Sequence, residues 1–208
     1  MKVLFFGCMI LLLSLACRKT NSNNRNASDI FPDKIGDQWV YLVNDTTVEN
    51  GLVTSIEDYN MNVSVTGSII LPGGINANIW VYSRPGHSDT CYVVQSSDTV
   101  QFYDIHELGT HLYSRRYIIP MALNNSWQYS PSYYNVTVDS LADILVGQNV
   151  FKRSYRIYGI SGMPDGMFTV SEWFQNNIGT VKRYFNPFGQ LILTKHFISW
   201  SLLSYDLE

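Results

Sequence analysis

From about residue 36 onward, apolar and polar residues alternate in short runs separated by turn-forming residues. The segments 62–66 and 134–138 each place apolar side chains on one face and polar side chains on the other, the pattern of a half-buried strand. Strand-favouring Val, Ile, Thr, Tyr, Phe and Trp are abundant, and Gly, Asn, Asp, Ser and Pro recur at short intervals. The pattern predicts an all-β domain.

The same alternation gives approximate strand positions. The ranges expected to form strands are 38–44, 51–59, 62–71, 77–83, 90–96, 100–106, 111–118, 134–138, 149–159, 167–176, 180–185 and 190–200. Residues 141–146 fit either a strand or one helical turn, and residues 201–207 fit either a final strand or a tail. Hairpins are expected around 161–166 and 186–189.

One short pattern occurs twice, in residues 31–41 and again 88 residues later in residues 119–129. Each copy has an apolar residue and Pro, then Gly or Asn four residues after the Pro, then Trp-x-Tyr. Pro cannot donate to a strand ladder, so it precedes pairing. Gly36 and Asn124 are of the two residue types that enter the left-handed region most readily. Each copy therefore predicts a turn that begins a strand.

A second sequence similarity between the two halves supports an internal duplication. Residues 99–103 (Thr-Val-Gln-Phe-Tyr) resemble residues 180–184 (Thr-Val-Lys-Arg-Tyr), and a Gly and another expected strand follow each segment. We interpret 31–118 and 119–208 as two pseudo-repeats. The alternative is that an all-β chain reuses the same turn-and-aromatic pattern by chance.

Aromatic residues are the one enriched residue class that could bind a ligand: the chain holds five Trp, 14 Tyr and ten Phe. Most are expected to fill the core. Aromatic rings on a concave sheet can also line an apolar pocket or stack on sugars. The candidate ligand-face residues are Trp39, Tyr41, Trp127 and Tyr129, and core packing is the alternative for each.

The amino terminus has the features of a processing segment. Lys2 precedes an apolar run from Val3 to Leu15, which is too short and too N-terminal to favour a spanning helix. Ser14-Leu15-Ala16-Cys17 resembles the lipobox of bacterial lipoproteins, with Ser14 in place of the commoner Leu. We expect residues 1–16 to be a signal peptide and Cys17 to carry lipid. An ordinary secretory signal with a coincidental Cys is the alternative.

The residues after Cys17 indicate which membrane of the cell envelope the protein is expected to occupy. Residues 17–29 are polar without hydrophobic period and are expected to form a flexible tether before a β domain of residues 30–208. In enterobacterial lipoproteins, Asp directly after the lipidated Cys favours the inner membrane. Arg18 stands there in this chain, so by that resemblance the outer membrane is expected. An acidic cluster typical of some surface-exported lipoproteins is absent, which favours the periplasmic face.

Charge and cysteine content narrow the possibilities further. The formal net charge of −3 becomes −4 when residues 1–16 are removed with Lys2, which argues against a nucleic-acid partner. Cys8 leaves with the signal and Cys17 is expected to be acylated, so Cys91 is alone and no intramolecular disulfide is possible. Cys91 lies in an apolar run and is expected to be a small buried hydrophobe.

These features resemble a group of small, mostly uncharacterised bacterial outer-membrane lipoproteins whose mature chains begin with (Y/F)-P-L-x-x-G-x-x-W-x-Y. The matching residues are Phe31, Pro32, Gly36, Trp39 and Tyr41, then Pro120 and Trp127, and residues 178–182. Asp33 replaces the Leu, and Asn124 replaces Gly in the second copy. The resemblance implies a single strongly curved antiparallel sheet like that of the LolA/LolB lipoprotein carriers: a half-barrel of about ten strands, with few short helical turns and a concave apolar side. It offers no catalytic residues to transfer.

The sequence offers little support for a catalytic or metal-binding site. His106 and His111 suggest zinc, but a His-Glu-x-x-His site needs a spacing of four on a helix, and Gly109 lies between these two. No serine-hydrolase elbow, phosphate loop or dinucleotide fingerprint occurs. The carboxylates Asp139, Asp143 and Glu172 have no local support as a glycosidase pair. We therefore expect no catalytic residues, no metal and no cofactor.

Three functional hypotheses follow. The first is a non-enzymatic envelope lipoprotein, anchored to the membrane by its N-terminal lipid, whose sheet either binds a hydrophobic or glycan ligand or serves as an envelope assembly component. The second is a hydrolase of envelope or dietary polymers, which predicts a cleft with converging polar residues. The third is an accessory subunit of a membrane complex, which predicts a large exposed apolar patch. An open cavity in the concave face favours the first hypothesis.

Overall fold

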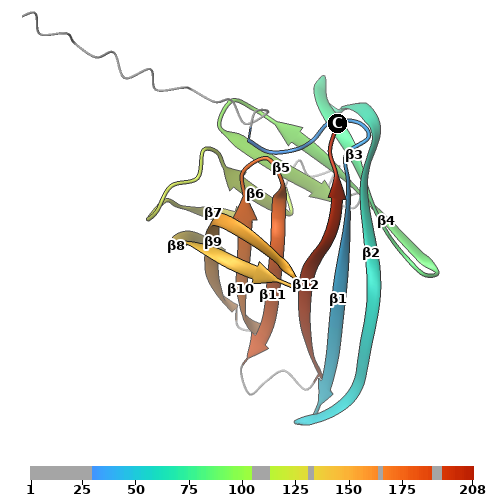
Figure 1. Cartoon of the computed structure of the whole chain (residues 1–208), viewed down its shortest axis with the longest axis vertical. Coiled ribbons are helices and arrows are strands. Elements are labelled where there is room, and N and C mark those ends of the chain that lie inside the picture. The colour runs from blue at the N-terminus through green and yellow to red at the C-terminus, as the bar shows by residue number, and fades with distance from the viewer. Residues whose placement is uncertain (1–29, 105–112, 131–133, 164–165, 189–193) are drawn as a thin grey trace, which may run out of the picture.

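The computed structural model describes residues 30–104, 113–130, 134–163, 166–188 and 194–208 (Figure 1). The expected signal peptide, Cys17, the tether and the pair His106 and His111 lie outside the described residues. The described strands are β1 (Gln38–Glu49), β2 (Leu52–Leu71), β3 (Ile75–Arg84), β4 (His87–Gln95), β5 (Thr99–Asp104), β6 (Arg115–Ile118), β7 (Ser126–Ser130), β8 (Tyr134–Val146), β9 (Asn149–Met163), β10 (Gly166–Gln175), β11 (Gly179–Phe188) and β12 (Thr194–Asp206).

All twelve strands form one antiparallel sheet in the order β6-β5-β4-β3-β2-β1-β12-β11-β10-β9-β8-β7. Consecutive strands therefore pair from β1 to β6 and from β7 to β12, and β1 also pairs with β12. The two strands at the edges, β6 and β7, are consecutive in the chain, so the sheet curls until its edges approach each other. The expected all-β, strongly curved antiparallel sheet is confirmed, with twelve strands in place of about ten.

Some strand bounds differ from the expected ranges, and in β8 the cause is a pair of β-bulges. The segments 51–59 and 62–71 form the single strand β2, and 134–138 joins 141–146 in β8. Irregularities in β8 fall between Val138 and Ser140 and between Ala142 and Ile144. A bulge adds one residue and reverses the alternation beyond it, so one strand looks like two in the sequence. Of the final expected segments, residues 194–200 and 201–206 lie in the single strand β12.

The two opening turns have the same backbone hydrogen bonds. In the first, Gly36 N donates to Val65 O (2.9 Å) and Val65 N donates to Asp37 O (3.0 Å). In the second, Asn124 N donates to Val138 O (2.8 Å) and Val138 N to Asn125 O (2.9 Å). Gly36 has φ +108° and Asn124 has φ +67°, which confirms the predicted positive φ values.

The antiparallel order defines two ends of the sheet. The near end is where β1 and β7 begin and where β2, β4, β8 and β10 turn into the next strand; the far end is the opposite one. In Figure 1 β1, β2 and β12 run side by side from one end to the other. The start of the described chain crosses the near end: Asn177 N donates to Ile30 O (2.6 Å), and Gln95 Nε2 donates to Phe31 O (3.2 Å).

Aromatic packing fills the near end of the interior. Trp39 stacks on Trp80 with ring centroids 4.8 Å apart. Phe31 lies 5.8 Å from the ring centres of both Trp80 and Phe174. These side chains are at most 6% exposed and form part of the hydrophobic core.

Candidate functional site

The four candidate ligand-face aromatics all lie on the inner face, where the sheet curls around them. Their exposed fractions are 2% for Trp39, 5% for Tyr41, 6% for Trp127 and 2% for Tyr129. Three of them donate to backbone carbonyls: Trp39 to Ile178, Tyr41 to Thr180 and Trp127 to Arg116, at 2.7, 2.8 and 2.6 Å. Each therefore contributes to the core, and Tyr129 also lines an open cavity.

That cavity, of about 360 Å³, opens at the far end of the inner face. A second cavity of about 30 Å³ lies next to it toward the near end, with Trp39 and Tyr41 in its lining and room for one or two waters. The two cavities share the side chains of Tyr82, Phe102, Arg115 and Arg183. The interior is thus packed at one end and open at the other.

A row of rings forms one wall of the large cavity. Tyr129 stacks on Tyr134 at 5.4 Å between centroids, Tyr134 meets Phe168 edge-on at 5.1 Å, and Phe168 lies 4.8 Å from Phe185. The row runs from β7 and β8 across the sheet to β10 and β11. It presents a continuous apolar surface inside an open space, which is the usual character of a small-molecule site.

Glu172 is a buried carboxylate on the inner face of β10, with an exposed fraction of 0%. Its Oε1 accepts from the Tyr117 hydroxyl (2.7 Å) and from the Thr180 hydroxyl, and its Oε2 accepts from the Tyr129 hydroxyl (3.1 Å). Burial, and next the charge of Glu172, raise the pKa of Tyr117 and of Tyr129, so both hydroxyls stay neutral donors. The carboxylate is enclosed by three hydroxyl groups.

Two arginines lie where the two cavities meet. Arg115 Nη2 donates to the Tyr82 hydroxyl (2.6 Å), and its guanidinium lies 3.9 Å above the centre of the Phe102 ring. Arg183 makes no hydrogen bond or ion pair with any described side chain, and its Nε is buried without a partner. Burial acts to lower the pKa of both guanidinium groups, but nearby tyrosines and Glu172 outweigh it and raise both pKa values, so both groups are charged.

The remaining charges of the large cavity stand at its mouth. Asp89 and Asp104 are exposed side chains in its lining. Asp89 Oδ2 lies 2.8 Å from His87 Nε2, within the distance of a hydrogen bond or an ion pair. The site therefore has two positive groups at its floor, one enclosed carboxylate behind them and two carboxylates at its entrance.

Cys91 is also in the cavity lining but is only 5% exposed. Burial raises the pKa of its thiol to about 11, so it is protonated near neutral pH and has little nucleophilic character. The predicted role as a small buried hydrophobe is confirmed.

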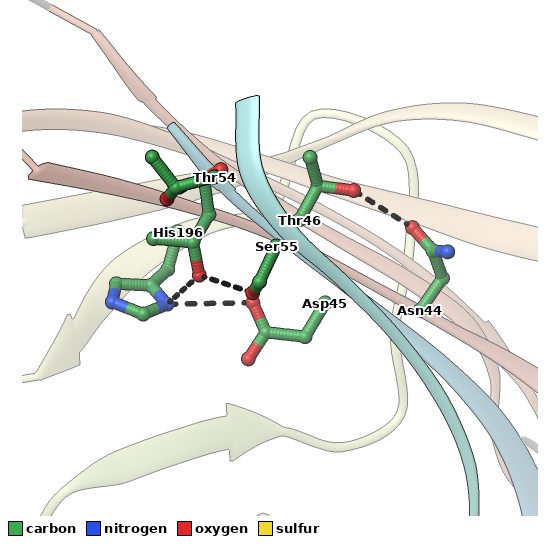
Figure 2. Close-up of polar contacts among 7 residues, drawn as sticks. Asn44, Asp45, Thr46, Thr54, Ser55 and His196 are labelled. Atoms are coloured by element: carbon green, nitrogen blue, oxygen red, sulfur yellow. Dashed lines mark hydrogen bonds and ion pairs between the residues drawn. The ribbon is translucent and has the colours of Figure 1, made fainter. Parts of the chain in front are cut away.

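A serine-hydrolase-like set of side chains occurs at the far end of β1, β2 and β12 (Figure 2). His196 Nδ1 lies 3.4 Å from Asp45 Oδ1 and also 3.4 Å from Thr47 Oγ1, to which Ser55 donates at 3.3 Å. A catalytic triad uses the two different ring nitrogens, one for the acid and one for the nucleophile. Here both contacts fall on Nδ1, so the set lacks the relay geometry.

The carboxylates weighed from the sequence do not converge. Asp139 is exposed and lies 3.6 Å from Arg156, and Asp143 is exposed and accepts from the Arg153 amide at 2.8 Å. Glu172 lies inside the sheet. Among the residues with described positions, no three His, Cys, Asp or Glu side chains gather closely enough to hold a metal ion.

Sequence inspection missed the two cavity arginines and the role of Glu172. The alternation does place Arg183 on the same face as the fully buried Val181, and Glu172 between the buried Val170 and Phe174. That signal was available, but a single charged residue in a strand more often marks a solvated position.

No protein-family model matches the chain, and no curated protein matches it. Among the described residues no helix has the length and apolar character needed to cross a membrane. A solved protein from Bacteroides fragilis, described as exported and having a YmcC-like fold, is 12% identical over 84% of this chain and 99% of its own, with a TM-score of 0.44. A solved protein from Parabacteroides distasonis, described as a lipoprotein, is 12% identical over 85% of this chain and 97% of its own, with a TM-score of 0.41. Neither likeness bears on ligand, partner or location.

Proposed function

We propose that this protein is a non-enzymatic binding protein that holds a ligand with an apolar body in the far-end cavity. The observation that carries the proposal is the open cavity of about 360 Å³ with a wall of four contiguous aromatic rings. Its volume falls in the range of small-molecule sites, roughly 300–1,000 Å³. Covering these rings with a ligand removes apolar surface from water and so favours binding.

The contrast between the two ends of the interior supports this proposal. Inside the near end, Phe31, Trp39 and Trp80 pack beside a cavity of about 30 Å³. The hollows of about 200 and 230 Å³ that Phe31 also borders have Phe31 as their one aromatic side chain. A fold that needed its inner face only for stability would gain by filling the far end in the same way.

The arrangement of polar groups supports a non-enzymatic function. Glu172 is buried, accepts from three hydroxyls and lines the cavity of about 30 Å³, which is too small for a substrate. The set around His196 lacks triad geometry, and Asp139 and Asp143 point to separate surface partners. A general acid or base must be within hydrogen-bond reach of the substrate.

The proposed location follows from the sequence. Ser14-Leu15-Ala16-Cys17 resembles a lipobox and Arg18 follows it, so we place the protein at the outer membrane through lipid on Cys17, on the periplasmic face. Ile30, the first described residue, lies at the near end, while the cavity opens at the far end. An anchored protein would then present its cavity at the end opposite its attachment.

Native mass spectrometry of the mature lipidated protein, purified from its own host envelope in a neutral detergent, tests this proposal. We expect an added mass that organic extraction removes while the covalent lipid remains. Ser130→Phe should abolish it, because Ser130 is buried in the cavity lining and the larger ring would fill the space. Ser204→Phe, on an exposed position of β12, is the matched control and should keep it. A mass without adduct in the wild type, or an adduct that Ser130→Phe retains, would contradict the proposal.

A further inference from the structure

We infer that the ligand carries one carboxylate group, bound by Arg183 and Arg115 at the cavity floor, with its apolar body along the wall of Tyr134, Phe168 and Phe185. This inference rests on the proposed function and deepens it, since it names the chemical class of the ligand.

Of the two cavity arginines, Arg183 more clearly lacks a hydrogen-bonding partner among the described residues. A guanidinium has five N–H donors, and none of those of Arg183 bonds to a described side chain. Its Nε is buried, so an unmade hydrogen bond there is costly. A carboxylate in the cavity would accept from this group in the two-pronged geometry that arginine and carboxylate share.

Arg115 is positioned to assist. Its only described hydrogen bond goes to the neutral Tyr82 hydroxyl, which leaves most of its donors unused. The Phe102 ring beneath its guanidinium, at 3.9 Å, anchors the group at the shared floor of the two cavities. An anchored guanidinium loses little freedom when it binds an anion.

The charge of Glu172 acts on both arginines, but its oxygens contact neither of them. Glu172 forms no ion pair with Arg115 or Arg183 within the described part of the chain, and its oxygens accept from Tyr117, Tyr129 and Thr180. Two positive charges therefore face one negative charge, and the floor keeps one uncompensated positive charge. One added carboxylate would balance it.

The mouth of the cavity limits how much negative charge the ligand can carry. Asp89 and Asp104 line the entrance and are exposed. A ligand with several anionic groups would place some of them near these carboxylates and be repelled. A single charge at one end, with an apolar remainder, fits both the floor and the entrance.

Calorimetric titration of the full mature chain in a neutral detergent tests this inference with four probes. They are 4-phenylbutanoate and octanoate, which represent aromatic and acyl carboxylates, and the amide of each. We expect at least one acid to bind about tenfold or more tightly than its amide, because only the acid accepts charge-assisted hydrogen bonds as an anion. Which acid binds better distinguishes an aromatic from an acyl source. Titration into protein-free micelles measures uptake by detergent.

Variants of Arg183 make the test specific. Arg183→Gln should remove the preference for acid over amide, Arg183→Lys should restore part of it, and Arg153→Gln, on an exposed position of β9, should change nothing. Thermal melts without probe check that Arg183→Gln is folded. If it is unfolded, Arg115→Gln serves in its place and should weaken acid binding.

The outcomes separate the two proposals. Equal affinity for acid and amide would overturn the carboxylate inference and leave the proposed binding function standing. An acid preference that survives both Arg183→Gln and Arg115→Gln would also overturn it. Binding of none of the four probes, together with a native mass free of adduct, would overturn the proposed function itself.

Discussion

The strands β1–β6 and β7–β12 meet at two junctions that differ in construction. At the β12–β1 junction, twelve residues of β1, from Gln38 to Glu49, each have a partner on β12. At the β6–β7 junction the described strands form no backbone ladder, and side chains hold them together. Trp127 Nε1 donates to Arg116 O at 2.6 Å, and the Tyr117 and Tyr129 hydroxyls lie 3.4 Å apart.

This difference explains where the cavity lies. A backbone ladder fixes neighbouring strands about 4.8 Å apart, whereas side chains can hold two strands at a larger separation. Arg115 of β6 and Tyr129 and Ser130 of β7 all line the large cavity. The open space for a ligand thus lies beside the junction that lacks a ladder, and the junction with a ladder supplies rigidity.

The largest expected effect comes from removing the indole that joins β6 to β7. Trp127→Ala should lower the free energy of unfolding by about 3–5 kcal/mol, because it deletes a large buried ring and the hydrogen bond to Arg116. Trp173→Ala is the control, since Trp173 is half-buried and lies between Arg156 and Lys182. Urea denaturation measures both. An equal loss for the two variants would show that Trp127 has no special part in this junction.

The next effect concerns the carboxylate behind the cavity. Glu172→Gln should lower the free energy of unfolding by about 1–3 kcal/mol, because an amide offers one acceptor oxygen to three hydroxyl donors. Glu57→Gln, at an exposed position of β2, should change it by less than about 0.5 kcal/mol. Chemical denaturation compares the two variants. If Glu172→Gln leaves the free energy of unfolding unchanged, the three hydroxyls readily find other partners.

The opening turns provide a smaller contrast between the two halves. Gly36→Ala should cost about 1–2 kcal/mol, because φ of +108° is strained for a side chain and the new Cβ would lie 2.8 Å from Glu208 Cγ. Asn124→Gly should be within about 0.5 kcal/mol of wild type, since Asn124 already occupies a left-handed conformation at φ +67°. Thermal melts of both variants check this. A Gly36→Ala variant as stable as wild type would refute the need for glycine at this position.

The smallest effect is a pH dependence confined to the first turn. Burial raises the pKa of Asp33 to about 7, despite its hydrogen bond from Trp80 Nε1, whereas the residue 88 positions later is the buried Met121. Because the folded state holds this proton above the unfolded pKa of about 3.8, stability falls as pH rises from about 4 to 7. Asp33→Asn should remove this term, of the order of 1 kcal/mol after solvent screening.

Melting temperatures of wild type and Asp33→Asn at pH 4.5, 6 and 8 measure the effect as a difference, in which the other titrating groups cancel. The advantage of the variant should grow with pH. A difference that stays constant, or that shrinks toward pH 8, would contradict the raised pKa.

Local physics made much of the fold predictable from the sequence. The alternation identified the inner face, and the Pro and Gly or Asn spacing predicted both opening turns with their positive φ at Gly36 and Asn124. The bulges in β8 were not predictable, because a one-residue shift leaves no composition signal. The duplication of 31–118 and 119–208 stays an interpretation, to which the matched turn hydrogen bonds lend support.

The candidate site was less predictable because its partners are remote in sequence. Glu172 meets Tyr117 and Tyr129 across separations of 55 and 43 residues, and only the curl of the sheet brings them together. The sequence did identify Tyr129 as a candidate ligand-face residue, and the structure places it in the wall of the cavity. The cavity arginines escaped notice since strand alternation alone does not separate a buried charge from a solvated one.

Hydrogen exchange of the backbone amides at the two junctions, with and without a bound ligand, tests the central claim most directly. Without ligand, amides of β6 and β7 should exchange faster than those of β1 and β12, because only the latter pair is joined by a ladder. Adding the tighter-binding carboxylate probe should slow exchange in β6 and β7 and leave β1 and β12 unchanged. Equal exchange at both junctions, or slowing confined to β1 and β12, would contradict the account.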